Sequence, residues 1–167
     1  MGAVEKRGHD DVSMRDLFVL DIPTGDDLPT DLSLPSRHFV CLIAWDARNA
    51  TNDEIAGVAL GLLEQGAAYV CAWGPDCERV HDIIDEERAG PNPPADVSDV
   101  VMTTWHEDES LAEAIRFALV CAWPDECYAE SCKSLLGVAI GSSSWAAEIR
   151  AAFSSPEQFV QRLDAET

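Results

Sequence analysis

The chain has 167 residues and carries 11 Lys and Arg against 31 Asp and Glu, a formal net charge of −20 at pH 7. Its hydrophobic fraction of 47% is ordinary for a globular protein, so the chain as a whole is not expected to be disordered. Nucleic acids and anionic membrane surfaces are bound by clustered Lys and Arg, and this charge excludes both as expected partners.

The beginning of the chain lacks the apolar run of a secretory signal, and no run approaches the roughly 18 apolar residues of a membrane span. We therefore expect a soluble, cytoplasmic protein. Residues 1–36 contain seven Asp and three Pro, and we expect them to form an acidic, partly ordered N-terminal arm. The short apolar stretch Leu17–Leu20 could add an edge strand to a sheet.

Residues 37–167 are expected to form one domain in which strands and helices alternate. Nearly continuous apolar runs are typical of strands that are buried on both faces, whereas Ser or Thr followed three residues later by Glu marks a helix start. These patterns predict strands over 38–45, 67–73, 97–105 and 135–140, and helices that begin near residues 51, 75, 110, 145 and 156. The loop between the second helix and the third strand is expected at 90–94.

The resulting β-α-β-α-β-α-β-α order predicts an α/β fold, because such alternation requires crossover connections between parallel strands. We expect a three-layer α/β/α sandwich with a mostly parallel sheet of four or five strands. The glycine-rich fingerprints of nucleotide-binding loops are absent from the sequence. The segment 141–144 (GSSS) could cradle an anion, but helix capping explains its serines better.

Three predicted strands end in tryptophan, and an acidic residue follows each within three positions. Ligands of open α/β sheets bind at the carboxyl ends of the strands, so these residues are candidates for a binding site. In the structural interpretation the indoles cover the core and the acids cap helices; in the other, indoles and carboxylates line a cleft for a cation or a sugar. The candidate binding residues are Trp45, Asp46, Trp73, Asp76, Trp105, Glu107 and Asp108.

A second set of residues suggests chemistry. His106 beside Glu107 could act as a general acid or base, with Cys77 as a nucleophile at a helix N-terminus. Cys77 and His81 are four residues apart on one helix, and with His106 they could ligate zinc if their strands are neighbours. No cofactor is the simpler expectation.

The acidity itself has three interpretations. It could serve solubility or growth in high salt, attract a basic protein, or surround a cationic ligand. We favour a protein-binding domain, of the kind that an inhibitor or immunity protein uses to neutralise a basic partner. The alternative is a small hydrolase or transferase that uses His106 with Cys77 or His81.

Overall fold

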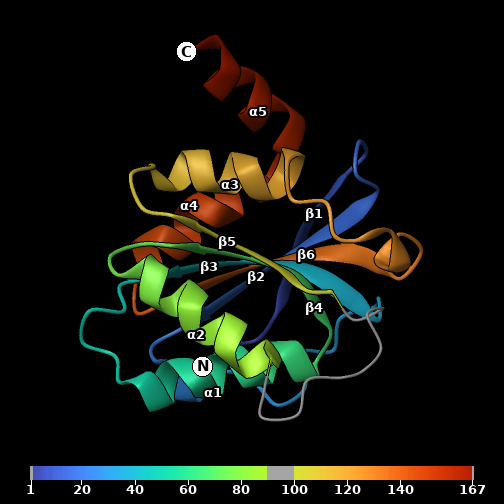
Figure 1. Ribbon diagram of the computed structural model, residues 1–167. Helices are drawn as coiled ribbons and strands as arrows, with labels where there is room; N and C mark the ends of the chain where they lie inside the picture. Colours follow the sequence, from blue (N-terminus) through green and yellow to red (C-terminus); the bar gives the residue numbers. More distant parts are fainter. Residues whose placement is uncertain (1, 90–99, 167) are drawn as a thin grey trace.

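The computed structural model describes residues 2–89 and 100–166, which form an α/β fold (Figure 1). The strands are β1 (Glu5–Asp10), β2 (Arg15–Ile22), β3 (His38–Trp45), β4 (Ala67–Trp73), β5 (Met102–His106) and β6 (Cys132–Ile140). The helices are α1 (Asn52–Glu64), α2 (Cys77–Ala89), α3 (Leu111–Val120), α4 (Ser143–Ser154) and α5 (Pro156–Ala165). Two short 3-10 turns are η1 (Gly25–Asp27) and η2 (Glu126–Tyr128).

The six strands form one sheet in the order β1-β2-β6-β3-β4-β5. All neighbouring strands are parallel except β1 and β2, which pair antiparallel. The predicted α/β class and the mostly parallel sheet are therefore confirmed. The predicted number of four or five strands is wrong, because the chain before residue 37 contributes two strands rather than one at most.

The N-terminal segment that we expected to be an arm holds these two strands. β2 lies inside the sheet, between β1 and β6, and its residues Leu17, Val19 and Leu20 are fully buried. β1 has the polar sequence EKRGHD and forms an outer edge, where a strand has a neighbour on one side only. A polar edge strand such as β1 lacks the apolar pattern from which a strand is predicted in a sequence.

The core lies on both faces of the sheet because side chains alternate along each strand. Cys41 and Ile43 of β3 pack into a cluster with α1 and α2, whereas Val40 and Leu42 pack into a second cluster with α3 and α4. Figure 1 shows α1 and α2 below the sheet and α3 and α4 above it, with α5 beyond α3.

The helix starts agree with the predicted caps at three positions. The Thr51 hydroxyl accepts from the Glu54 amide (3.1 Å), the Ser110 hydroxyl from Glu113, and the Ser142 hydroxyl from Trp145. The second helix begins at Cys77 rather than Pro75, because Gly74 and Asp76 both have positive φ. The predicted loop at 90–94 and the first part of the predicted strand 97–105 lie outside the described residues.

Two adjacent strands send the chain to opposite faces of the sheet. β3 leads into α1 on one face, and β6 leads into α4 on the other. Neighbouring strands that diverge in this way leave a crevice at their carboxyl ends, where open α/β sheets bind ligands. In the described part of the chain, no helix is long and apolar enough to cross a membrane.

Candidate functional site

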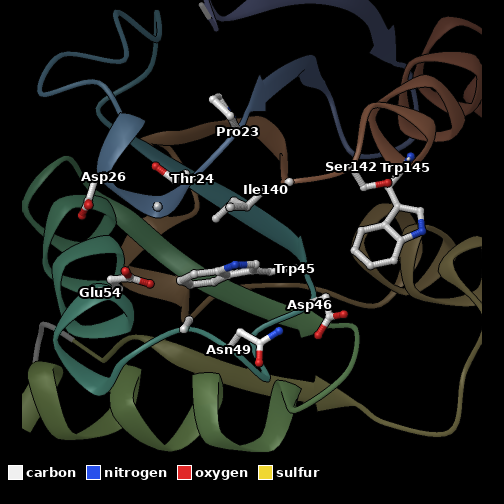
Figure 2. A pocket seen from close by; sticks show the side chains of 13 residues that line it. Pro23, Thr24, Asp26, Trp45, Asp46, Asn49, Glu54, Ile140, Ser142 and Trp145 are labelled. Carbon is white, nitrogen blue, oxygen red and sulfur yellow. Dashed lines mark hydrogen bonds between the residues drawn. The ribbon is translucent and has the colours of Figure 1, made fainter.

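A cleft of about 480 Å³ opens at this point, where β2, β3 and β6 end (Figure 2). Its wall comes from the turn after β2, from the loop between β3 and α1, and from the start of α4. The lining residues are Pro23, Thr24, Gly25, Asp26, Trp45, Asp46, Asn49, Ala50, Glu54, Ile140, Gly141, Ser142 and Trp145. The cleft therefore gathers segments that are far apart in the sequence.

The Trp45 indole lies across the middle of the cleft, with Glu54 and Asp46 on either side of it in Figure 2. The side chain is only 6% exposed, so it forms part of the core as well as part of the wall. Gly25 allows the η1 turn to approach it: a Cβ there would lie 3.3 Å from Cη2 of Trp45 and 2.8 Å from Val58.

The cleft is acidic. Three carboxylates line it, those of Asp26, Asp46 and Glu54, and no Lys, Arg or His is among the lining residues. Arg48, outside the lining, holds Asp46 through two hydrogen bonds, from Nε to Oδ1 (2.9 Å) and from a terminal guanidinium nitrogen to Oδ2 (2.7 Å). These bonds stabilise the charged carboxylate, so they hold the pKa of Asp46 below its ordinary value.

We expect Arg48→Met to return the pKa of Asp46 towards that ordinary value. A lowered pKa means that the ion pair stabilises the fold above the carboxyl's ordinary pKa, and that this contribution is lost as the pH falls through the lowered pKa. Titration of the carboxyl carbon by NMR measures the shift, with Arg162→Met on α5 as the control. An Asp46 pKa unchanged in Arg48→Met would contradict the assignment.

The opposite wall is built at the start of α4. The Ser142 hydroxyl accepts from the Trp145 amide (3.3 Å) and lies 3.0 Å from the Ser144 hydroxyl. This segment therefore caps the helix, as the sequence favoured. The Trp145 indole borders the cleft and meets Trp73 edge to face, with 4.9 Å between ring centroids. Trp73 thus supports the cleft wall from behind.

Residues 9–156 match the family described as Domain of unknown function (DUF7684). The chain belongs to the DUF7684 family. All the residues that line the cleft fall within the matched range. No curated protein and no solved structure matches the chain.

In this DUF7684 member, Asp76 does not line the cleft. Its carboxylate accepts a hydrogen bond from Nε of Arg79 (2.7 Å), and the Arg79 guanidinium donates to the carbonyl oxygens of Ala47 and Ala50 and to Oδ1 of Asn52 (2.8 Å). Arg79 thereby fixes the loop between β3 and α1, which carries Asp46 and Asn49. Asp76 is a positioning residue for that loop.

Trp105 and His106 point to opposite faces of the sheet. Trp105 is 44% exposed and contacts His81 of α2, with 4.5 Å between ring centroids. His106 is 4% exposed and packs against Phe117 of α3, while its ring nitrogens bond Glu109 and Thr104 (3.0 Å each). The sheet therefore separates His106 from His81, although His106 directly follows Trp105, which contacts the His81 ring.

The predicted zinc site of Cys77, His81 and His106 is not assembled in this arrangement. Within residues 2–89 and 100–166, no group of three or more His, Cys, Asp or Glu could hold a metal ion. Cys77 is buried, and burial raises the pKa of its thiol, which keeps it protonated at neutral pH. The geometry thus gives no support to Cys77 as a nucleophile.

Two predicted binding residues, Glu107 and Asp108, are exposed beyond the end of β5 and do not line the cleft. Conversely, Asp26, Glu54 and Trp145 line the cleft but are not among the predicted site residues. Asp26 lies in the segment expected to form an arm, and Glu54 fits the pattern of a helix start. The strand order alone would have revealed that these residues converge.

Proposed function

We propose that the domain binds a basic protein partner at the carboxyl edge of its sheet, and that a lysine or arginine side chain of the partner enters the cleft. The observation that carries the proposal is the make-up of the cleft. Trp45 and Trp145 offer indole surfaces, three carboxylates surround them, and no basic side chain lines the site.

The chemistry of the cleft suits a cation. An ammonium or guanidinium group is attracted to the face of an indole, and a guanidinium can bond a carboxylate with two parallel hydrogen bonds. Desolvation in a cleft strengthens both interactions. At longer range, a net charge of −20 steers a basic partner towards the surface, which can raise association rates by about 10–1000-fold.

An inhibitor or immunity protein that neutralises a basic enzyme is the partner relationship that fits these features best. Such a protein needs no catalytic groups of its own, and it gains speed from opposite charge and specificity from a few buried contacts. The cleft supplies the buried contacts, and the remaining acidic surface supplies the steering.

Two triple variants test the proposal with equal net charge. Asp26→Asn/Asp46→Asn/Glu54→Gln removes the carboxylates of the cleft. Glu130→Gln/Glu157→Gln/Glu166→Gln removes the same number of exposed carboxylates that do not line it. Binding is measured by calorimetry with a short oligoarginine peptide, then with basic proteins captured from the host at low salt.

We expect the cleft triple to weaken binding about tenfold or more, as loss of close charge partners does, and the control triple by much less. Binding by the native chain should fall steeply as salt rises. Equal losses in the two triples would mean that only the overall charge matters, as a role in solubility or salt tolerance predicts. An affinity that does not change with salt concentration would also contradict the proposal.

A further inference from the structure

A buried arginine lies at the opposite end of the sheet from the cleft. Arg15, the first residue of β2, is 2% exposed, and no described residue accepts a hydrogen bond from its Nε. Its guanidinium lies under the Trp123 indole, with 4.7 Å from Cζ to the ring centroid. Buried charges in proteins are normally paired and fully hydrogen-bonded, so this arrangement calls for an explanation.

The nearby carboxylate does not form the missing pair. Asp10 faces Arg15 across the β1–β2 hairpin, and its charge acts on the guanidinium. However, the Asp10 oxygens accept from the amides of Val12 and Ser13 and from the Ser13 hydroxyl (2.6 Å). Asp10 therefore closes the hairpin turn, and burial lowers the pKa of Arg15 from its ordinary value. An arginine side chain nevertheless stays charged in a protein.

An apolar groove of about 430 Å³ lies beside two neighbours of Arg15, although Arg15 itself does not line it. Both Trp123, which covers the guanidinium, and Asp10, its partner across the hairpin, line this groove. The other lining residues are Val12, Leu119, Val120, Pro156, Glu157, Val160 and Gln161. Val12 and Trp123 are among the most exposed large apolar side chains of the described residues.

The start of α5 also borders the groove. Pro156 and Glu157 open this ten-residue helix, and its N-cap, Ser155, makes no side-chain capping bond. The N-terminal end of α5, which carries the positive end of the helix dipole, therefore lies at the groove. Volume, apolar walls and one buried cation are the features of a site for a small amphiphilic molecule.

We propose that this groove binds an aliphatic carboxylate, whose chain packs against Val12, Val120 and Val160 and whose head group pairs with Arg15. The Trp123 indole must move off the guanidinium for the head group to reach it. Arginine is the side chain that suits a carboxylate best, because its donors form two parallel bonds. Asp10 and Glu157 repel the anion. The repulsion is reduced because the Asp10 carboxylate accepts hydrogen bonds within the hairpin and Glu157 is exposed to water.

The test uses octanoate as the probe and octanol as its neutral counterpart, with calorimetry and tryptophan fluorescence as readouts. We expect octanoate to bind one to one and to change the Trp123 emission, which Trp123→Phe identifies. Octanol should bind about tenfold more weakly or worse, the usual effect of losing a charge-assisted hydrogen bond. Arg15→Met should abolish this preference, whereas Arg15→Lys should keep part of it.

Arg15→Met is expected to remain folded, because an apolar side chain of similar length replaces an incompletely bonded buried cation. Thermal unfolding confirms this before binding is measured. Equal binding of octanoate and octanol, undiminished octanoate binding by Arg15→Met, or no octanoate binding up to its solubility limit would each overturn the proposal.

Salt separates this proposal from the proposed function. Added salt screens the repulsion between the acidic surface and octanoate more than it screens a buried pair, so octanoate binding should strengthen or stay constant. Oligoarginine binding at the cleft should weaken instead. The cleft triple should leave octanoate binding unchanged, so either proposal can fail without the other.

Discussion

Replacing Gly74 by alanine is expected to lower the free energy of unfolding by about 2–5 kcal/mol, through backbone strain and overpacking together. Gly74 joins β4 to α2 with a φ of +117°, a conformation that a side chain disfavours. A Cβ at this position would overlap the carbonyl oxygen of Trp45. The strain would therefore reach the backbone of the residue at the centre of the cleft.

Gly57→Ala is the matched control, because it makes the same chemical change inside helix α1, where an added Cβ meets nothing within 4 Å. Alanine is the better helix former by roughly 0.5–1 kcal/mol, so this variant should be more stable than the native chain. Urea unfolding measures both. A Gly74→Ala protein as stable as the native chain would show that the turn can relax away from Trp45.

Trp45→Ala should cause the second large effect, a loss of about 3–5 kcal/mol of stability, as is typical when a buried aromatic side chain is removed from a core. The indole lies beside Gly25, belongs to the same core cluster as Val58 and is almost fully buried. The same change removes the central surface of the cleft. Binding of the oligoarginine peptide should fall with it, even at a temperature where the variant is folded.

Trp105→Ala provides the control with the same substitution at the end of another strand. Trp105 is 44% exposed and its indole contacts His81, so a change in stability below about 1 kcal/mol is expected. Denaturant unfolding gives the stabilities, and calorimetry below the transition gives the binding. Equal destabilisation by the two variants, or oligoarginine binding retained by folded Trp45→Ala, would refute the roles assigned here.

The sequence predicted the buried centre of the fold better than its edges. The runs HFVCLIAW and AAYVCAW form β3 and β4 with the predicted ends, because strands buried on both faces need continuous apolar residues. The edge strand β1 has no such requirement, and its polar sequence does not predict a strand. The position of β6 between β2 and β3 depends on pairing between distant residues, which local patterns do not encode.

The candidate site was predicted only in part for the same reason. Trp45, Trp73 and Trp105 each precede an acid, and by sequence they were equivalent. The structure places Trp45 in the cleft, Trp73 behind Trp145, and Trp105 on the outer strand of the sheet. Strand order and the alternation of side chains across the sheet distinguish them. The same alternation divides His106 from His81.

The place of β6 has a consequence for the order in which the fold assembles. β6 is the last of the described strands along the chain, yet it occupies the middle of the sheet, and β2 and β3 are joined only through it. A nascent chain that stops before residue 132 has neither a joined sheet nor the second wall of the cleft. Pairing over such long sequence distances is also slow. The joined sheet and the complete cleft therefore form only when β6 pairs with both β2 and β3.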